Sequence, residues 1–384
     1  MKPLVPKTDN ALLNKLYSDT FPIARRREEV MGYAGSALFG RASEAVFCPA
    51  EIALHRLGTQ RESLAIPNPS YGQAPDLYLH EYHDVFFAHG VPFDMKGTAI
   101  RDGARFSSKR PFIFTKFSDA KVLDDNWGYL PKIKIKNIST IDVPCYLCGV
   151  SSDHFGHAVV EEIIALYQLD LVPEAHILSA VKPCDAFIQM AEGLGISRDR
   201  IIVAPDACLV KQLFIPTRPR DFYNTAYAAI DIWNRVVECY NEFDGSPNTS
   251  VYLSRRNTMN RRLLNEAAVE NFFKDYGFEV AYPEELSVPE KVRLLSRAER
   301  VVGAVGSTML NVLFSKHFKT MNTLYLMGWK LLEHAFLESL YGKKYYYVTN
   351  PDMRTDTSSN DDWILPLEEL DLAMQQWLGL EQVS

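Results

Sequence analysis

The sequence predicts an α/β protein with two Rossmann-like domains that face a cleft, and a small N-terminal β-rich region. From about residue 141, short apolar segments alternate with segments of helical periodicity, which is typical of parallel strands connected by helices. The alternation stops at the turn residues 244–248 and then starts again. We therefore expect an N-terminal helical and β-rich region (1–135), a first Rossmann-like domain (136–245) and a second one (246–384).

The composition narrows the class of protein. The chain has 384 residues, of which 47% are hydrophobic and 23% charged, as in an ordinary globular protein. Its formal net charge of -7 argues against a general nucleic-acid binder. No apolar run is long enough to cross a bilayer, and the first residues do not have the apolar core of a signal peptide. We expect a cytoplasmic protein whose six cysteines are free thiols.

The first 135 residues contain few patterns that indicate a catalytic or binding site. Residues 1–45 are charged and partly helical, and residues 58–76 are rich in loop-forming residues. Alternating polar and apolar residues predict a β-rich region over 65–130, with one further strand at 111–114. Three histidines gather in this region, but no carboxylate or cysteine completes a metal site, so we interpret them as core or surface residues: His80, His83 and His89.

The first Rossmann-like domain is predicted from its alternation of strands and helices. The strands are expected at 143–147, 175–178 and 201–204, and the helices at 160–167, 187–194 and 223–243. Cys145 and Cys148 have the spacing of a metal-binding pair, but they lie in an apolar run, and we interpret this run as a buried strand.

The second domain repeats the alternation five times. Its strands are expected at 250–253, 278–281, 300–303, 323–326 and 345–348. Its helices are expected at 261–276, 287–298, 307–317, 329–340 and 367–378. In such open sheets, ligands bind at the carboxyl ends of the strands.

A cluster of arginines follows the first strand of this second domain. Arg255, Arg256, Arg261 and Arg262 fall within eight positions, where a strand ends and a loop begins. Guanidinium groups bind phosphate oxygens through paired hydrogen bonds, so the segment is a candidate site for a diphosphate. A solvated basic turn is the alternative interpretation.

A glycine turn provides the second candidate anion site. The strand that ends at Gly303 leads through Gly306 to Ser307 and Thr308, which can cap the next helix. Backbone N–H groups and the helix dipole favour an anion there. The dinucleotide-binding fingerprint and the P-loop lysine are both missing. A glycine turn before a helix is also common packing, so its value depends on its sharing a sheet edge with Arg255 and Arg256.

The third candidate site lies in the first domain. His157 and Glu161 are four residues apart and share one helix face, so the pair could act as a general base. An exposed glutamate in a helix-capping segment is the alternative. The sequence contains no Asp-x-Asp triplet, so we do not expect a divalent metal to hold a nucleotide sugar.

Taken in order, these motifs resemble glycosyltransferase family 61. The resemblance rests on Ser254-Arg255-Arg256, Arg261-Arg262, Asn265-Glu266, residues 277–280, 283–287 and the turn 303–314, with His157-x-x-x-Glu161 upstream. It implies a GT-B fold and an inverting, metal-independent transfer of sugar from a nucleotide-sugar donor, expected to be a UDP-sugar. No other cofactor is implied. The acceptor would be a glycan, a lipid-linked glycan or a polysaccharide, with peripheral membrane contact and oligomeric state left open.

The resemblance also implies roles for individual residues. His157 and Glu161 would lie near the acceptor, one of them as the base. The donor would be bound by these residues: Arg255, Arg256, Glu285, Gly306, Ser307, Thr308 and Asn311.

The chain departs from the family pattern in two places. Val305 stands where the family usually has a histidine, and Phe155 and Ala158 stand near the places of a tyrosine and a tryptophan. A catalytically inactive sugar- or nucleotide-binding subunit is therefore an alternative function, and an epimerase acting on the donor is a third.

Overall fold

The computed structural model describes most of the 384-residue chain. The described residues are 20–22, 27–40, 46–47, 54–58, 76–88, 90–100, 106–107, 110–111, 121–124, 127–129, 138–148, 154–205, 207–221, 224–328, 333–350 and 361–381. The chain divides into two compact units. The first unit is Met1–Val46 with Gln73–Ile232, and the second is Phe47–Gly72 with Trp233–Ser384.

The second unit is built on a parallel sheet of six strands. Their order is β19-β18-β20-β21-β22-β4, and every neighbouring pair is parallel. The bounds are β18 Thr249–Leu253, β19 Glu279–Ala281, β20 Ala298–Ala304, β21 Asn322–Met327, β22 Tyr345–Thr349 and β4 Leu54–Arg56. The first strand of the series, β18, therefore lies between the second and the third, which is the doubly wound arrangement of a Rossmann-like domain.

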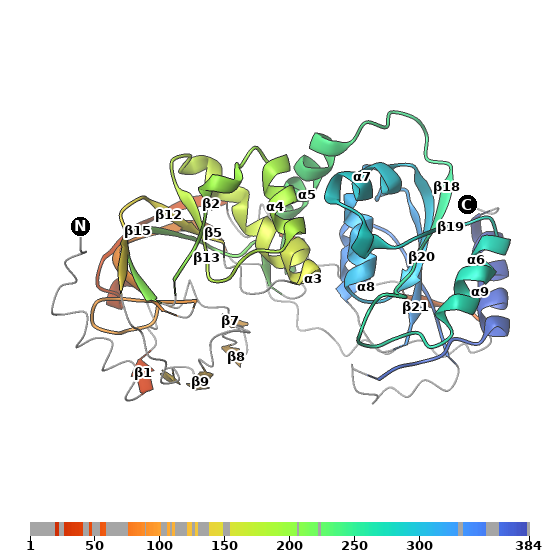
Figure 1. Ribbon diagram of the computed structural model, residues 1–384, viewed down its shortest axis with the longest axis horizontal. Helices are drawn as coiled ribbons and strands as arrows, with labels where there is room; N and C mark the ends of the chain where they lie inside the picture. Colours follow the sequence, from red (N-terminus) through yellow and green to blue (C-terminus); the bar gives the residue numbers. More distant parts are fainter. Residues whose placement is uncertain are drawn as a thin grey trace. The chain divides into compact units, whose positions relative to one another are not determined.

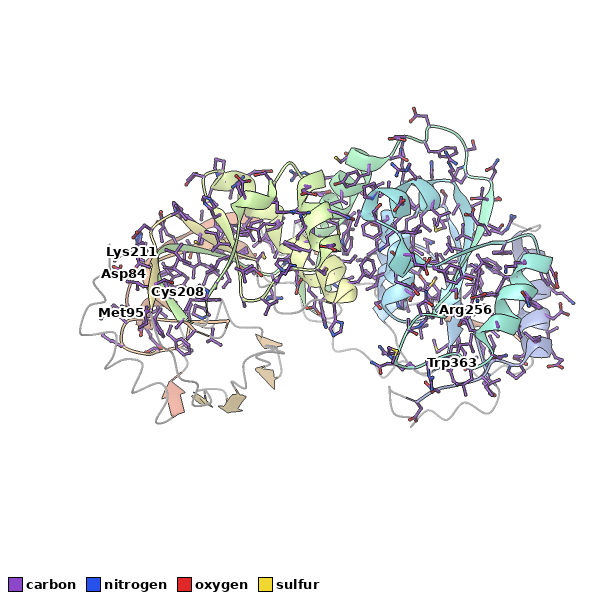
Figure 2. The ribbon with its side chains drawn as sticks, in the orientation of Figure 1. Asp84, Met95, Cys208, Lys211, Arg256 and Trp363 are labelled. Carbon is purple, nitrogen blue, oxygen red and sulfur yellow. The ribbon has the colours of Figure 1, made fainter. Side chains whose placement is uncertain are left out.

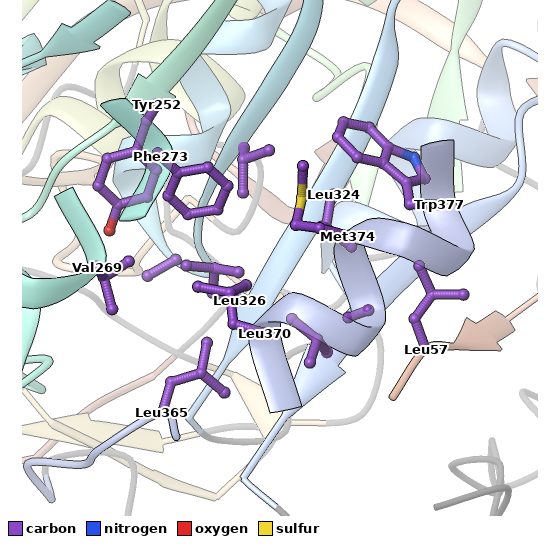
Figure 3. Packing of buried hydrophobic residues seen from close by; sticks show 14 of the residues in the cluster. Leu57, Tyr252, Val269, Phe273, Leu324, Leu326, Leu365, Leu370, Met374 and Trp377 are labelled. Carbon is purple, nitrogen blue, oxygen red and sulfur yellow. The ribbon is translucent and has the colours of Figure 1, made fainter. Parts of the chain in front are cut away.

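Helices cover both faces of this sheet (Figure 1). One face carries α6 (Glu266–Asp275) and α9 (Leu367–Glu381), and the other carries α7 (Val288–Ser296) and α8 (Glu333–Leu340). The side chains of Met374 and Trp377 on α9 pack with Tyr252, Leu324 and other apolar residues of the sheet (Figure 3). Strands that are buried on both faces read as short apolar runs, which is why the sequence pattern predicted them.

The first unit contains a mixed sheet of eight strands. The order is β14-β13-β12-β15-β5-β2, and β11 and β6 pair with β15 and β5. The bounds are β2 Tyr33–Gly40, β5 Leu77–Ala88, β6 Val91–Phe93, β11 Ser139–Ile141, β12 Cys145–Leu147, β13 His176–Ser179, β14 Ile201–Val203 and β15 Ala207–Pro216. Its helical segments are α3 Phe155–His157, the π-helix η3 Ala158–Glu162, the 3-10 helices η4 Ile163–Leu171 and η5 Arg198–Arg200, α4 Asp185–Gly193 and α5 Tyr227–Tyr240.

Shorter elements complete the described chain. Three strands form one small sheet, β1 Thr20–Pro22, β10 Trp127–Tyr129 and β9 Lys121–Asp124, and a second one contains β16 Arg220–Asp221, β17 Asn224–Ala226 and β3 Val46–Phe47. A pair is formed by β7 Phe106–Ser107 and β8 Arg110–Pro111. In the charged N-terminal segment, the described residues form the 3-10 helix η1 (Arg27–Glu29) and the strands β1 and β2. No helix among the described residues has the length and apolar character that a bilayer crossing requires.

The structure confirms most of the predicted elements of both Rossmann-like domains. The parallel strands β12, β13 and β14 and all five predicted strands of the second unit are present. Cys145 and Cys148 are buried, and Cys145 lies in β12, as the strand interpretation requires. Of the three N-terminal histidines, His80 is buried and bonded to Ser36 and Thr217, His83 contacts Glu81, and His89 lies outside the described residues.

Two parts of the prediction differ from the structure. The helix expected at 261–276 begins only at Glu266, because Arg261 has a left-handed backbone (φ 54°) and Leu263 pairs with Trp363. The pattern also missed β15, which pairs with β5 in antiparallel register over most of its length. The predicted β-rich stretch thus joins the main sheet of the first unit, and Lys211 and Asp84 form an ion pair across these strands (Figure 2).

A segment from the N-terminal part of the chain completes the sheet of the second unit. Strand β4 pairs with β22, and Gly58 follows it with a left-handed backbone (φ 102°). The Gly58 N–H donates to Gln376 Oε1 on α9 at 2.8 Å. A Cβ on Gly58 would lie 1.9 Å from Oε1 of the buried Glu369. Only glycine fits this close approach to α9.

We expect Gly58→Ala to destabilise the second unit by about 1–2 kcal/mol or more, because alanine meets both the left-handed strain and the contact with Glu369. Gly379→Ala in α9 is the matched control, since its Cβ would meet nothing within 4 Å and helical Gly→Ala gains about 0.5–1 kcal/mol. Urea denaturation of both variants measures the difference. Equal stability of Gly58→Ala and the unsubstituted protein would contradict the described docking of β4.

Candidate functional site

Two segments follow neighbouring strands of the second unit: the arginine loop (residues 254–262) and the glycine turn (residues 303–308). Leu253 at the end of β18 pairs with Gly303 near the end of β20. From these two strands the chain winds in opposite directions, to β19 on one side and to β21 on the other. Such a switch point is where open α/β sheets bind their ligands, just beyond the carboxyl ends of the strands.

Arg255 connects the two segments. It is only 6% exposed, and its Nη1 donates to the Val305 carbonyl at 3.1 Å. Its Nη2 donates to the Asn260 carbonyl at 3.3 Å, within the arginine loop. The two segments therefore meet, as the sequence predicts.

The glycine turn after β20 forms a sharp elbow at Gly306. Its backbone is left-handed (φ 128°), and a Cβ there would lie 2.3 Å from Arg255 Nη1. Only glycine allows both the backbone angle and the approach of the guanidinium. The 3-10 helix η7 (Ser307–Phe314) starts directly after it, shorter than the predicted helix.

The residues of the elbow differ in their exposure. Ser307 is exposed at the start of η7, whereas Thr308 is 7% exposed and Asn311 is 1% exposed. Asn311 Nδ2 donates to the Thr308 carbonyl at 2.6 Å, inside the helix. Of these three residues, Ser307 is the one whose side chain is open to solvent.

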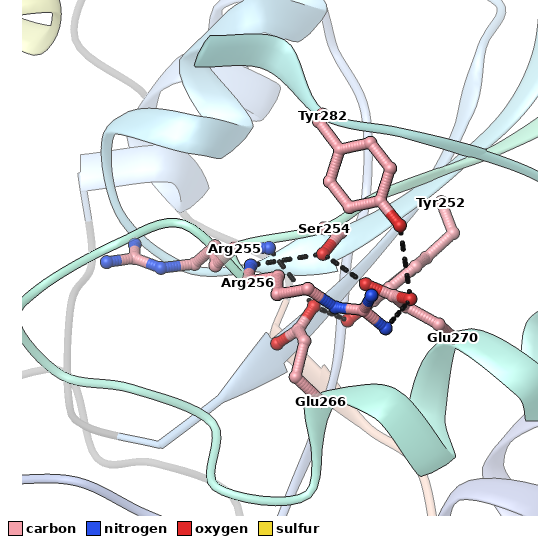
Figure 4. Close-up of polar contacts among 7 residues, drawn as sticks. All are labelled: Tyr252, Ser254, Arg255, Arg256, Glu266, Glu270 and Tyr282. Carbon is pink, nitrogen blue, oxygen red and sulfur yellow. Dashed lines mark hydrogen bonds and ion pairs between the residues drawn. The ribbon is translucent and has the colours of Figure 1, made fainter. Parts of the chain in front are cut away.

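Two buried carboxylates lie beneath the arginine loop (Figure 4). Both come from α6, one turn apart. Glu266 Oε1 accepts from the Tyr252 hydroxyl at 2.7 Å and from the Arg255 backbone N–H at 3.0 Å. Glu270 accepts from the Ser254 hydroxyl at 2.8 Å, from Tyr282 at 3.2 Å and from the Arg256 guanidinium.

The other arginines of the cluster have different environments. Arg256 is half-exposed, with its guanidinium on Glu270 and 5.9 Å from the centre of the Tyr282 ring. Arg262 is exposed and pairs with Asp362 through Nη2 at 2.6 Å. Glu285 is exposed in the 3-10 helix η6 (Pro283–Glu285) and accepts from Asn257 Nδ2 at 2.9 Å. Glu285 thus lies beside the loop, and Arg256 within the loop is already paired with a carboxylate.

The site concentrates positive charge. Burial lowers the pKa of Arg255 from its ordinary value, and the nearby charge of Arg261 lowers that pKa further. Burial also lowers the pKa of Arg261. Both guanidinium groups stay charged at neutral pH, because their ordinary pKa is so high. Burial raises the pKa of Glu266, and hydrogen bonds from Tyr252 and the Arg255 N–H oppose this rise.

One residue that contacts the elbow could not be predicted from the sequence pattern. His334 on α8 is 1% exposed, and its Nε2 accepts the Gly306 N–H at 3.1 Å. Its ring stacks on Tyr325 with 5.3 Å between the ring centres. Its contact with the elbow depends on how α8 packs, so only the structure could identify it.

The predicted histidine–glutamate pair forms in the first unit. His157 Nδ1 lies 3.1 Å from Glu161 Oε1, and the two side chains are 35% and 29% exposed. The pair belongs to the first turns of the helical segment that follows β12, at the carboxyl edge of the parallel strands. The predicted shared helix face is confirmed, and an imidazole that contacts a carboxylate can accept a proton.

Further charged residues surround this helix start. Glu162 is fully buried, and its charge raises the pKa of Arg218 while burial lowers that pKa more strongly. Arg220 Nη1 donates to the Val160 carbonyl at 3.3 Å. Both arginines follow β15, the strand that the sequence pattern missed.

The described residues contain no group of three or more His, Cys, Asp or Glu side chains that could hold a metal ion.

The arrangement agrees with a comparison against protein families. Residues 153–321 match the family described as Glycosyltransferase 61, and no curated protein matches the chain. The matched residues include the His157–Glu161 pair, the arginine loop and the glycine elbow. The match over residues 153–321 supports membership of glycosyltransferase family 61 and an activity as a glycosyltransferase.

Proposed function

We propose that the protein is an inverting, metal-independent glycosyltransferase that moves a sugar from a nucleotide-sugar donor to a glycan or polysaccharide acceptor. The observation that carries this proposal is the hydrogen bond from Arg255 to the Val305 carbonyl. It joins a buried positive charge to the start of η7 at the switch point of the second unit. A diphosphate needs this combination of charge and open backbone N–H groups.

In this proposal the second unit holds the donor. The first N–H groups of a helix have no partner within the helix, so those of Ser307 and Thr308 are suited to the diphosphate oxygens. Arg255 and Arg261 add positive charge, Arg256 and Glu285 support the loop, and Asn311 supports the start of η7. As the bond to the sugar breaks, the charge that develops on the diphosphate is stabilised by donors that are already in place.

The first unit supplies the base. Glu161 or His157 removes the proton from the acceptor hydroxyl, and the oxygen forms a bond to the anomeric carbon. The bond from that carbon to the diphosphate oxygen breaks on the opposite face, and the nucleoside diphosphate leaves with the electron pair. Attack from the opposite face inverts the configuration. The contact of His157 with Glu161 supports a role in this proton transfer.

The remaining specifics belong to the same proposal. The donor is a UDP-sugar, and the acceptor is a glycan or a lipid-linked glycan in polysaccharide biosynthesis. The two units form a GT-B arrangement in the cytoplasm. Metal independence rests on the arginines, whose guanidinium groups can supply the positive charge that a diphosphate needs.

Replacing Arg255 tests the donor site. We expect Arg255→Ala to lower the turnover of the nucleotide sugar by about 100-fold or more. Comparable losses follow when one preorganised hydrogen-bond donor is removed from an active site. Arg262→Ala is the matched control, because Arg262 is exposed in the same loop and pairs only with Asp362 among the described residues. The measurement is release of UDP from a panel of UDP-sugars, with thermal melting of each variant. Unchanged turnover in Arg255→Ala would remove its role.

Replacing the pair in the first unit tests the base. We expect Glu161→Gln and His157→Asn to lower kcat, the larger loss being about 100-fold or more, because general base catalysis contributes that much. Donor affinity should stay the same, since the pair lies in the other unit. Glu174→Gln, at an exposed position of the first unit, is the control. Full activity in both pair variants would show that neither residue is the base.

A further inference from the structure

The peptide unit between Val305 and Gly306 is fixed at both of its polar ends. Its carbonyl accepts from Arg255 Nη1 at 3.1 Å, and its N–H donates to His334 Nε2 at 3.1 Å. The two partners come from different elements: Arg255 lies in the loop after β18, and His334 lies on the helix α8. A peptide plane held on both sides cannot rotate without breaking one of these bonds.

The orientation of this plane decides where the next N–H groups point. Gly306 has no Cβ and a backbone conformation (φ 128°) that most residues avoid, so its own sterics do not fix the turn. The neighbouring side chains fix it instead. A flip of the 305–306 peptide would redirect the start of η7, which holds the N–H groups of Ser307 and Thr308.

His334 is itself held rigidly. It is 1% exposed and stacks on Tyr325, which stacks on Tyr345 at 4.5 Å between ring centres. The Tyr325 hydroxyl donates to the fully buried Glu338, which also accepts from Thr323 at 2.8 Å and pairs with Lys343 at 2.6 Å. All of these residues follow the segment matched to the family, residues 153–321.

We propose that His334 is a positioning residue of the donor site, which fixes the glycine elbow by accepting the Gly306 N–H through Nε2. This inference rests on the proposed function. His334 thus places a histidine side chain at the elbow, although position 305, where the family usually has a histidine, is a valine. The bond requires the neutral ring with its hydrogen on Nδ1, because a protonated Nε2 cannot accept.

The decisive variants are His334→Phe and His334→Gln. Phenylalanine keeps a ring that can stack on Tyr325 but has no acceptor, whereas the glutamine side-chain oxygen can accept the Gly306 N–H. We expect His334→Phe to weaken UDP binding about tenfold, equal to about 1.4 kcal/mol, and His334→Gln to recover most of that loss. His317→Phe is the matched control, since His317 lies after η7 and packs against Phe243.

The experiment measures UDP binding by calorimetry and by the shift in melting temperature. UDP binding to His334→Phe as tight as to the unsubstituted protein would overturn the inference, and so would an equal loss in both variants. If the unsubstituted protein binds neither UDP nor another nucleoside diphosphate, the proposed function fails instead. Should His334→Phe not fold, nitrogen NMR of the unsubstituted protein decides: an unprotonated Nε2 is expected, and a protonated one would refute the bond.

Discussion

The hydrogen bond between the Arg255 guanidinium and the Val305 carbonyl is the contact on which the site of the second unit depends. It exists because β18 and β20 are parallel neighbours whose ends coincide at Leu253 and Gly303. The guanidinium of Arg255, two residues beyond the end of β18, can then reach the carbonyl of Val305, one residue beyond the end of β20. The same contact needs a glycine at 306, because any Cβ there would occupy the space of Nη1.

A buried guanidinium is costly unless its surroundings compensate for the lost hydration. For Arg255, the carbonyls of Val305 and Asn260 accept hydrogen bonds from the guanidinium, and the charge of Glu266 on α6 favours its charged form. Glu266 receives the Arg255 backbone N–H and the Tyr252 hydroxyl, while Glu270 fixes Ser254 and Arg256. The carboxylates hold the main chain at Arg255 and the side chains of Ser254 and Arg256, whereas the Arg255 guanidinium donates to the elbow. The arginine that pairs with a carboxylate, Arg256, and the arginine that contacts the elbow, Arg255, are thus consecutive residues.

Much of this arrangement follows from local sequence patterns. The strands of the second unit are short apolar runs between turn residues, and the His157–Glu161 pair follows from a spacing of one helical turn. Strand β15 was missed because a buried apolar run has no periodicity of its own, and its long partner β5 lies far away in the sequence. The helix α6 was expected too early, because Leu263 has helical spacing but pairs with Trp363.

The part of the site that could not be predicted depends on tertiary packing. Nothing near His334 in the sequence points to the elbow, and the contact arises only because α8 lies against the sheet beside β21 and β22. The same holds for β4, whose pairing with β22 brings Arg56 beside Tyr347. Such contacts join segments that are separated by many residues, so no local periodicity encodes them.

The electrostatics of the arginine loop favour our proposal of a diphosphate over a neutral sugar alone. Burial lowers the pKa of both Arg255 and Arg261, and the nearby charge of Arg261 lowers the pKa of Arg255 further. Glu266 and Glu284 offset part of this repulsion for Arg255. A diphosphate would add charge-assisted hydrogen bonds to both guanidinium groups. A neutral ligand would displace water from these guanidinium groups without supplying that charge.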